Sequence, residues 1–290
     1  MKTLINILGT ARSGSTLIDL ILGNDDRAFS LGEIRSWFRP FKSQHLKINC
    51  LCGSTECPWE KLRHIKEREF YELAFYQLNV DYLIDSSKYL PWIIDNNLLA
   101  ADRNYKVRNV LIFKKPVDFI YSFWKREIKI SNAFQYFKKY HSRLLQAQLP
   151  FIALNYNDFV ADPDKQLEQL CGLIGMPYFI GKKQIFKKQY HHLFGSPGIR
   201  NQLNNENNSI RAQIDIPREF IDLIPEIESQ ISRDMKIQEI LSCLNSRILQ
   251  TETDWNPGNI RKPWWYYWQT ISARFRARRI RILKNLHGVI

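Results

Sequence analysis

Residues 3–22 read TLINILGTARSGSTLIDLIL. An apolar run at 3–8 precedes the loop GTARSGST at 9–16, and a second apolar run follows at 17–22. This order predicts a strand, a glycine-bounded loop and a helix. The loop matches the phosphate-binding template G-x-x-x-x-G-K-[ST], except that Ser15 occupies the lysine position. Backbone N–H groups of such a loop, together with the start of a helix, attract anions, so we expect this loop to bind phosphate or sulfate.

The missing lysine restricts the reactions that this loop can support. In nucleotidases that lysine reaches the β- and γ-phosphates, and its absence argues against hydrolysis of a nucleoside triphosphate. The cation that the loop does carry is Arg12. We therefore expect the loop to bind an anionic ligand, and we do not expect it to bind ATP as a substrate for hydrolysis.

Further strands are predicted at 82–85, 109–113 and 151–154, where short apolar runs recur between helical stretches such as 118–128 and 164–174. Buried parallel strands alternating with helices predict an α/β fold with a central parallel sheet flanked by helices. Polar clusters follow three of these strands, at 9–16, 85–88 and 114–116. Since ligands bind beyond the carboxyl ends of such strands, these clusters are expected to share one crevice.

The net charge of +13 is mostly a property of the C-terminal tail. After Asp254 there are eight basic residues and no acidic ones, so subtracting eight from +13 leaves +5 for the first 254 residues. We see no signal-peptide pattern and no run of the roughly 18 apolar residues that a membrane span needs. We therefore expect a soluble cytoplasmic protein with reduced thiols.

Taken together, the clusters resemble those of sulfotransferases that use 3′-phosphoadenosine 5′-phosphosulfate (PAPS), especially bacterial members related to the tyrosylprotein and carbohydrate enzymes. Residues 9–16 resemble their 5′-phosphosulfate loop, and 111–122 resemble their 3′-phosphate element, although the family usually has arginine where Lys114 stands. Segments 84–88 and 156–163 are also similar, and 191–200 resembles a loop that covers the cofactor. The resemblance spans roughly residues 3 to 200 and implies a P-loop-like sulfotransferase fold.

The resemblance implies roles for individual residues. The 5′-phosphate would bind the backbone and hydroxyl groups of the loop, and the 3′-phosphate would bind the strand-end element. The cofactor-binding residues implied are Arg12, Ser13, Gly14, Ser15, Thr16, Lys114, Ser122, Gly195, Ser196 and Arg200. The products would be a sulfated acceptor and adenosine 3′,5′-bisphosphate.

Sulfuryl transfer is an in-line displacement, so its catalysis rests on positioning and on neutralising charge. Arg12 is placed to stabilise the leaving phosphate oxygen, and Lys88 to stabilise the sulfuryl oxygens. Glu33 follows the first helix at the spacing where tyrosylprotein-type enzymes have a catalytic glutamate, and we expect it to act as the general base. The reaction requires no metal. The expected acceptor is a hydroxyl or amine of a small molecule or glycan.

Two other functions remain open. One is a P-loop kinase or NTPase, against which the residue at position 15 argues. The other is a non-catalytic, anion-binding or membrane-associated protein with a degenerate sulfotransferase fold. Asp85 is expected to orient the 85–88 turn rather than to take part in chemistry.

Three of the five cysteines, Cys50, Cys52 and Cys57, lie within eight residues. This density suggests zinc, but no fourth ligand follows at the usual spacing, although His45 or His64 would be able to reach. The resemblance implies a structural or substrate-side loop instead, and we expect no metal site.

Pro257 and Gly258 predict a boundary between a sulfotransferase domain at 1–256 and a basic, aromatic helical appendage at 257–290. In this appendage Trp268, Ile271, Phe275, Ile282 and Leu286 are expected to form one apolar stripe beside arginines. Such a helix suits peripheral contact with an anionic membrane, or packing on a partner subunit. Without a recognition fold, the charge does not predict nucleic-acid binding.

Overall fold

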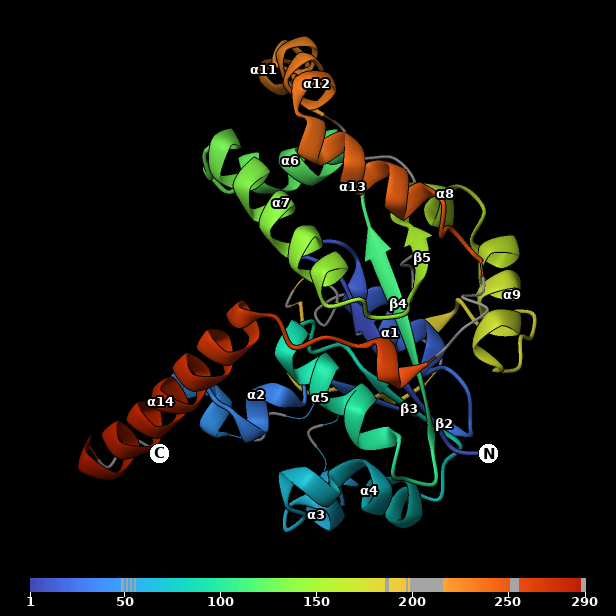
Figure 1. Cartoon of the computed structure of the whole chain (residues 1–290). Coiled ribbons are helices and arrows are strands. Elements are labelled where there is room, and N and C mark those ends of the chain that lie inside the picture. Colours follow the sequence, from blue (N-terminus) through green and yellow to red (C-terminus); the bar gives the residue numbers. More distant parts are fainter. Residues whose placement is uncertain are drawn as a thin grey trace.

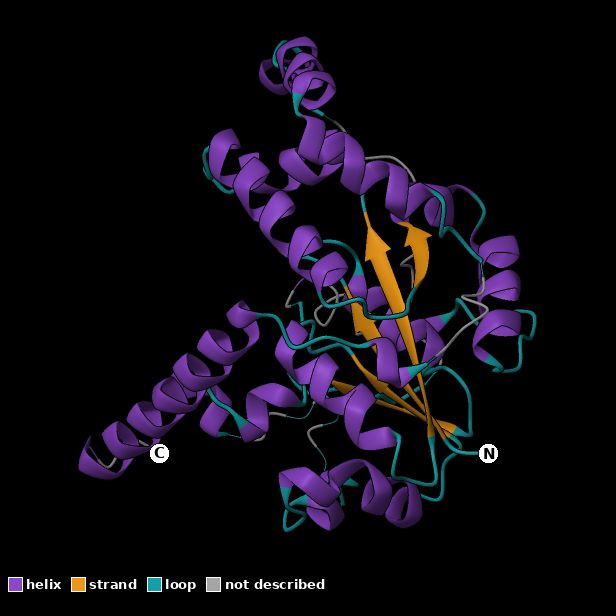
Figure 2. Ribbon diagram, in the orientation of Figure 1, coloured by secondary structure: helices purple, strands orange, loops and turns teal. Residues whose placement is uncertain are grey.

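The computed structural model describes residues 1–47, 50, 52, 54, 56–185, 188–196, 198, 216–250 and 256–287, with the backbone alone at 283–287. Within this part of the chain, five parallel strands form one sheet flanked by helices (Figures 1 and 2). Their order is β2-β3-β1-β4-β5, and β1 lies at the centre. The strands are β1 (Thr3–Leu8), β2 (Ala28–Gly32), β3 (Tyr82–Asp85), β4 (Lys106–Phe113) and β5 (Ile152–Asn155).

The predicted α/β class and its four strands are confirmed, with two differences. Strand β4 begins three residues earlier than expected, at Lys106, where it pairs with Thr3. Strand β2, which the sequence did not predict, adds an edge strand beside β3. It was missed because its five residues, AFSLG, are few and include a serine and a glycine, so neither an apolar run nor a clear alternation marks them.

Alternate residues of the central strand face two different hydrophobic layers. Leu4 and Leu8 pack into the layer beneath α4, α5 and α7, whereas Ile5 and Ile7 pack against α1 and α9. All six residues of β1 are buried, as parallel strands covered on both faces should be. The chain thus leaves β1 on one face of the sheet and β3 on the other, which opens a crevice beyond their carboxyl ends.

The helices that cover the sheet and its ends vary from one turn to six or more (Figure 1). The α-helices are α1 (Ser15–Leu22), α2 (Arg35–Phe38), α3 (Trp59–Leu62), α4 (Phe70–Leu78), α5 (Leu90–Ala100), α6 (Pro116–Trp124), α7 (Ile130–Gln146), α8 (Tyr156–Ala161), α9 (Pro163–Ile174), α11 (Arg218–Ile221), α12 (Ile224–Arg233), α13 (Met235–Asn245) and α14 (Trp264–His287). Three short 3-10 helices accompany them: η1 (Ser43–Leu46), η2 (Glu67–Glu69) and η4 (Pro257–Asn259).

The helices predicted at 118–128 and 164–174 differ in how well their bounds hold. The helix expected at 164–174 is α9, which ends at Ile174. Gly175 follows it in the left-handed conformation, with φ of 73°. The helix expected at 118–128 is α6, which already ends at Trp124, and Glu127 just beyond it has φ of 60°. A left-handed residue cannot continue a right-handed helix, so the prediction ran one turn too far. The Asn-rich segment at 201–208 lies outside the described residues.

Helix α14 follows the predicted boundary at Pro257 and projects from the body (Figure 1). Its start is anchored: Trp265 is buried, and its Nε1 donates to Gln146 at 2.9 Å. The expected apolar stripe is largely exposed, since Trp268 and Phe275 are each 69% exposed and Ile271 and Ile282 are nearly half exposed. The side chain of Leu286 lies outside the described residues. Contact of this stripe with a membrane or a second subunit stays a prediction.

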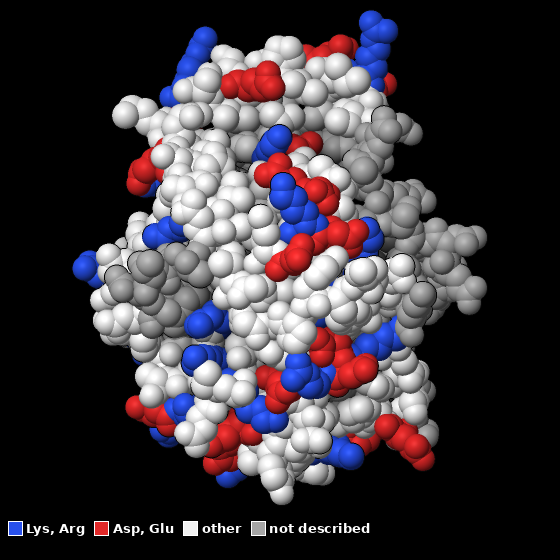
Figure 3. All heavy atoms as spheres, turned by 90° about the vertical axis from the view of Figure 1, so that its right-hand side faces the viewer, with Lys and Arg blue, Asp and Glu red and all other residues white. Residues whose placement is uncertain are grey.

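No helix in the described part of the chain, α14 included, has the length and apolar character needed to cross a bilayer. On the face of the molecule seen in Figure 3, basic and acidic side chains are interspersed. That face is therefore not a continuous basic surface.

Candidate active site

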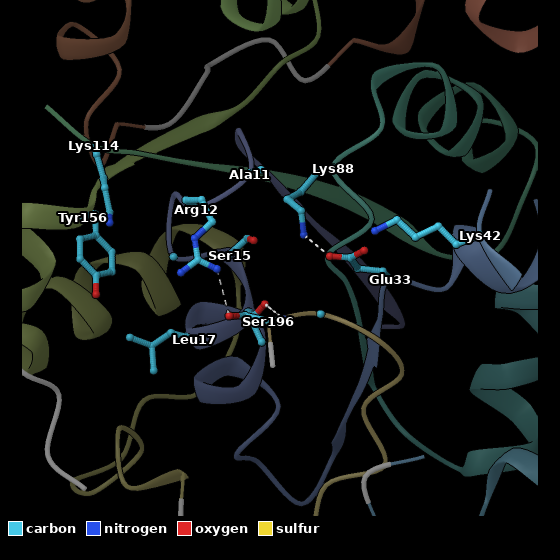
Figure 4. Close-up of a pocket in the computed structure, with 13 residues that line it drawn as sticks. Ala11, Arg12, Ser15, Leu17, Glu33, Lys42, Lys88, Lys114, Tyr156 and Ser196 are labelled. Carbon is cyan, nitrogen blue, oxygen red and sulfur yellow. Dashed lines mark hydrogen bonds and ion pairs between the residues drawn. The ribbon is translucent and has the colours of Figure 1, made fainter. Parts of the chain in front are cut away.

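A pocket of about 430 Å³ lies at the carboxyl ends of the central strands (Figure 4). Segments far apart in the sequence meet there, as the polar clusters predicted. Its lining consists of Ala11, Arg12, Gly14, Ser15, Thr16, Leu17, Glu33, Lys42, Lys88, Lys114, Tyr156, Gly195 and Ser196. Nine of these thirteen residues belong to the set expected from the sequence. Arg200 lies outside the described residues, so its place in the site stays a prediction.

The glycine-bounded loop wraps tightly into the start of α1. Gly14, with φ of 105°, precedes Ser15, and a Cβ at Gly14 would lie only 2.5 Å from the Tyr156 ring. Only glycine fits this close approach at this backbone conformation. The loop therefore presents the first turn of α1 to the pocket, where free backbone N–H groups favour an anion. Arg12 takes the left-handed conformation with φ of 73°, which turns its side chain along the pocket wall (Figure 4).

Two tyrosines from α7 hold this loop from outside. The backbone N–H of Gly9 donates to the Tyr140 hydroxyl at 2.9 Å, and that of Ala11 donates to the Tyr136 hydroxyl at 3.3 Å. The Tyr140 hydroxyl in turn donates to the carbonyl oxygen of Lys88 at 3.1 Å. Tyr140 therefore joins the phosphate loop to the turn that carries Lys88. Sequence reasoning missed these tyrosines, because nothing in a helical stretch indicates which strand end it will reach.

Two of the expected cofactor residues lie behind the pocket surface rather than on it. The Ser13 hydroxyl is buried and has no hydrogen-bond partner in the described structure. Ser122 accepts a hydrogen bond from Lys114 Nζ at 3.3 Å and donates to the carbonyl oxygen of Asp118 at 2.8 Å. Ser122 thus supports Lys114, which does line the pocket and whose Nζ lies 4.6 Å from the Tyr156 ring centre.

Arg12 and Lys114 lie on the same side of the pocket, and their positive charges destabilise each other. Burial, and next the charge of Arg12, lowers the pKa of Lys114 to about 8. Burial and nearby Arg126 also lower the pKa of Arg12. Positive groups that lose solvation and repel each other are stabilised when an anion binds between them. The electrostatics of the wall therefore favour a phosphate or sulfate ligand.

Glu33 and Lys88 form an ion pair on the opposite side of the pocket (Figure 4). Lys88 Nζ donates to Glu33 Oε1 at 2.6 Å and to the carbonyl oxygen of Ser86 at 2.9 Å. Both side chains keep partial access to solvent, at 16% and 23% exposure for Lys88 and Glu33. Lys88, like Arg12, is left-handed, with φ of 59°. Asp85 holds this turn as expected, because its Oδ1 accepts from the Ser87 backbone N–H at 2.8 Å.

A backbone contact fixes the direction of Glu33. Its N–H donates to the carbonyl oxygen of Leu193 at 3.0 Å. A Cβ at the preceding residue, Gly32, would lie 2.1 Å from the same oxygen, so this position requires glycine. The segment that carries Leu193 continues to Gly195 and Ser196, and the Ser196 N–H donates to Thr16 Oγ1 at 3.2 Å. This segment therefore links Glu33 to the phosphate loop.

Other lining residues were not assigned roles from the sequence. Lys42 stands just before η1 and adds a cation near Glu33 (Figure 4). Tyr156 begins α8, directly after β5, and stacks beneath Lys114. The sequence contains one indication for Tyr156, because the segment 156–163 resembles the sulfotransferase family. Nothing in the sequence around Lys42 indicates that this lysine lines the pocket.

Behind the loop lies a buried polar network centred on Asp19 of α1. Its carboxylate accepts from Ser30 Oγ at 2.6 Å and from Ser86 Oγ at 2.5 Å. Ser30 Oγ also lies 2.7 Å from Nδ1 of His192. Burial raises the pKa of Asp19 to about 7. The network ties α1, β2, the 85–88 turn and the segment around His192 together beneath the pocket.

The raised pKa of Asp19 predicts a pH-dependent stability. The folded state favours the neutral carboxyl, so its contribution is fully present below the unfolded pKa of about 4 and is lost as pH rises through about 7. We expect the contribution of Asp19 to the free energy of unfolding to fall by about 1 kcal/mol per pH unit between pH 5 and 7. Asp19→Asn should remove this slope, whereas Asp26→Asn, at an exposed position, should keep it. Urea unfolding across this range measures both, and equal slopes in the two variants would contradict the assignment.

Comparison with known proteins gives the fold. No protein-family model matches the chain, and no curated protein matches it in sequence. Among solved structures it resembles the sulfotransferase domain of the Synechococcus PCC 7002 olefin synthase, with a TM-score of 0.53 and 16% identity over 81% of this chain and 96% of that domain. It also resembles the sulfotransferase domain of the curacin biosynthetic pathway, with a TM-score of 0.51 and 18% identity over 80% of this chain and 98% of that domain. The chain has a sulfotransferase fold.

The expected fold class is thereby confirmed. One of these domains belongs to an olefin synthase and the other to the curacin biosynthetic pathway, so the closer likeness to tyrosylprotein and carbohydrate enzymes stays a prediction. In this structure the loop after β1 and Lys114, just after β4, line one pocket.

Proposed function

We propose that the protein is a sulfotransferase that moves a sulfuryl group from PAPS to a hydroxyl or amine of a small molecule or glycan. The observation that carries this proposal is the shared pocket. The loop at 9–16 and Lys114 lie on one side of it, and the Glu33–Lys88 pair lies on the other.

The residues of the pocket fit PAPS in several ways. The ligand has anionic groups at its 5′ and 3′ ends, and the side of the pocket that carries the loop offers two basic residues, Arg12 and Lys114. Burial and the charge of Arg12 lower the pKa of Lys114 more than nearby Asp118 raises it, so a bound anion would stabilise the charged lysine. The N–H groups at the start of α1 are further donors for a phosphate. Gly14 has no side chain, so the Tyr156 ring can lie close to the backbone of the loop.

When bound, PAPS supplies an activated sulfuryl group, whose S–O bond to the 5′-phosphate breaks as the acceptor oxygen or nitrogen bonds to sulfur. Glu33 accepts the proton that the acceptor loses. Arg12 neutralises the charge that develops on the leaving phosphate oxygen. Lys88 orients the Glu33 carboxylate and supplies a second positive charge close to the reacting groups.

Ligand-induced stabilisation tests the cofactor. Adenosine 3′,5′-bisphosphate at 100 times its Kd should add about 2.7 kcal/mol to the free energy of unfolding, which corresponds to a rise of about 5 °C in Tm. Adenosine 5′-monophosphate, which lacks the 3′-phosphate, should bind more weakly. Lys114→Ala should reduce the difference between the two nucleotides, because it removes the cation assigned to the 3′-phosphate. Thermal unfolding followed by fluorescence measures each shift.

The same experiment separates the alternatives. Stabilisation by ATP–Mg²⁺ but not by the bisphosphate would favour a P-loop kinase or NTPase and would contradict the proposal. Stabilisation by the bisphosphate without turnover of PAPS, across phenolic, carbohydrate and amine acceptors, would favour a non-catalytic protein that retains the fold. Lys115→Ala is the matched control, because Lys115 neighbours Lys114 but does not line the pocket.

A further inference from the structure

The three clustered cysteines meet a histidine from a distant part of the chain. Cys50, Cys52 and Cys57 lie between η1 and α3, and His191 lies about 135 residues later. One ligand atom of each of these four residues lies within 4.8 Å of all the others. Cys57 is buried, and the other three are partly buried. The expected partners, His45 and His64, are not members of this cluster.

The distances match a metal site. His191 Nδ1 lies 3.6 Å from Cys57 Sγ and 3.8 Å from Cys50 Sγ. In tetrahedral zinc sites, bonds of about 2.3 Å to sulfur and about 2.0 Å to nitrogen place these two atoms about 3.5 Å apart, close to the separations seen here. We propose that Cys50, Cys52, Cys57 and His191 bind one zinc ion through three thiolates and the imidazole Nδ1. This proposal departs from the sequence-based expectation of no metal.

The surroundings of the four ligands suit this role. The His191 ring stacks on Phe29 of β2, with ring centres 5.9 Å apart and planes 1° from parallel. Its carbonyl oxygen accepts a hydrogen bond from the Trp59 indole. The Ser54 N–H lies 3.4 Å from Cys52 Sγ, as a donor to a thiolate should. Partners of this kind fix ligand orientation around bound metals.

A zinc ion here would be structural. Four protein ligands fill a tetrahedral site and leave no open position for water or substrate. The ion would join the 50–57 loop to the segment after His191, which a backbone bridge between Cys50 and Leu193 already brings together. The same segment binds Glu33 through Leu193 and lines the pocket with Gly195 and Ser196. Zinc would thus stabilise one wall of the pocket, whatever reaction occurs there.

The alternative for these thiols is oxidation. A disulfide would consume two of the three cysteines and would leave His191 without a role in the cluster. All five cysteines of the structure are free thiols. The geometry therefore favours the metal, and a disulfide becomes one outcome of the test.

Metal analysis of the purified full chain tests the proposal without reference to catalysis. We expect about one zinc ion per chain by elemental mass spectrometry, as a four-ligand site requires. His191→Gln and Cys52→Ser should each lose most of this zinc. The controls His64→Gln and Cys243→Ser, at a nearby exposed histidine and a distant cysteine, should retain it. A chelator should release the ion and lower Tm in the wild type, but have little effect on His191→Gln.

Cobalt gives a second readout that does not depend on the folding of variants. Wild-type protein reconstituted with Co²⁺ should show the intense visible absorption of tetrahedral, thiolate-bound cobalt. Zinc-free wild type that gives no such spectrum would overturn the proposal, as would a disulfide among the three cysteines. Equal zinc in His191→Gln and wild type would overturn the assignment of the fourth ligand. None of these results bears on PAPS binding, so the two proposals fail separately.

Discussion

Glu33→Gln is expected to lower the rate of sulfuryl transfer by about 10²–10⁴-fold, the range typical for loss of a general base. The amide keeps the size of the side chain and can still accept the hydrogen bond from Lys88, but it cannot take a proton. The initial rate of adenosine 3′,5′-bisphosphate formation, with any acceptor that the wild type uses, measures the loss. Binding of the bisphosphate should be nearly unchanged, because Glu33 is not assigned to either phosphate.

Glu228→Gln is the matched control for this variant. Glu228 is an exposed residue of α12, outside the pocket, so its removal should leave the rate unchanged. A Glu33→Gln protein that retains its rate within about twofold would show that another group removes the proton, because acid–base catalysis contributes far more than that. Equal loss of rate and of bisphosphate binding would instead point to collapse of the pocket wall at Leu193.

Arg12→Ala should lower the rate by about 10²–10³-fold, the usual cost of removing one preorganised donor to a developing anion. It should also weaken binding of adenosine 3′,5′-bisphosphate, whereas Glu33→Gln should not. Because Arg12 is one cause of the lowered pKa of Lys114, that pKa should rise in the variant. Steady-state kinetics and isothermal titration calorimetry measure the first two effects.

Two further variants sharpen the role of Arg12. Arg12→Lys should restore part of the binding through its charge but less of the rate, since an ammonium lacks the planar fork of a guanidinium. Arg63→Ala removes an exposed arginine that pairs with Glu60 on the surface, and it should behave as wild type. A full wild-type rate in Arg12→Ala would remove Arg12 from the mechanism.

Local patterns allowed much of this site to be predicted from the sequence. The loop that carries Arg12, and the strand ends before Lys88 and Lys114, are contiguous stretches whose residue types and order indicate their geometry. The parallel sheet then brings those strand ends together, which is why distant clusters meet in one pocket. Glu33 was located through a family resemblance, and its pairing with Lys88 emerged only in the structure.

The missing parts depend on tertiary packing. Tyr140 reaches Gly9 across 131 residues, and His191 reaches Cys57 across 134 residues. No spacing rule connects residues so far apart, because the intervening elements set where they meet. The sequence near the cysteines indicated His45 and His64 as candidate zinc ligands, whereas the structure places His191 beside the three thiols. The edge strand β2 similarly depends on its neighbour β3. The early end of α6 depends on the left-handed conformation of Glu127, so hydrophobic periodicity predicts neither feature.

The central position of β1 has a consequence for how the chain is made. Strand β1 is synthesised long before its partner β4, in which Lys106 pairs with Thr3, and before Tyr140, which holds the loop after β1. More than a hundred residues must therefore be synthesised before the first strand is enclosed on both edges. Until then, an apolar segment that will be fully buried remains exposed and prone to aggregation. Strand β1 is thus made well before the elements that enclose it, and its apolar residues are open to wrong contacts during this interval.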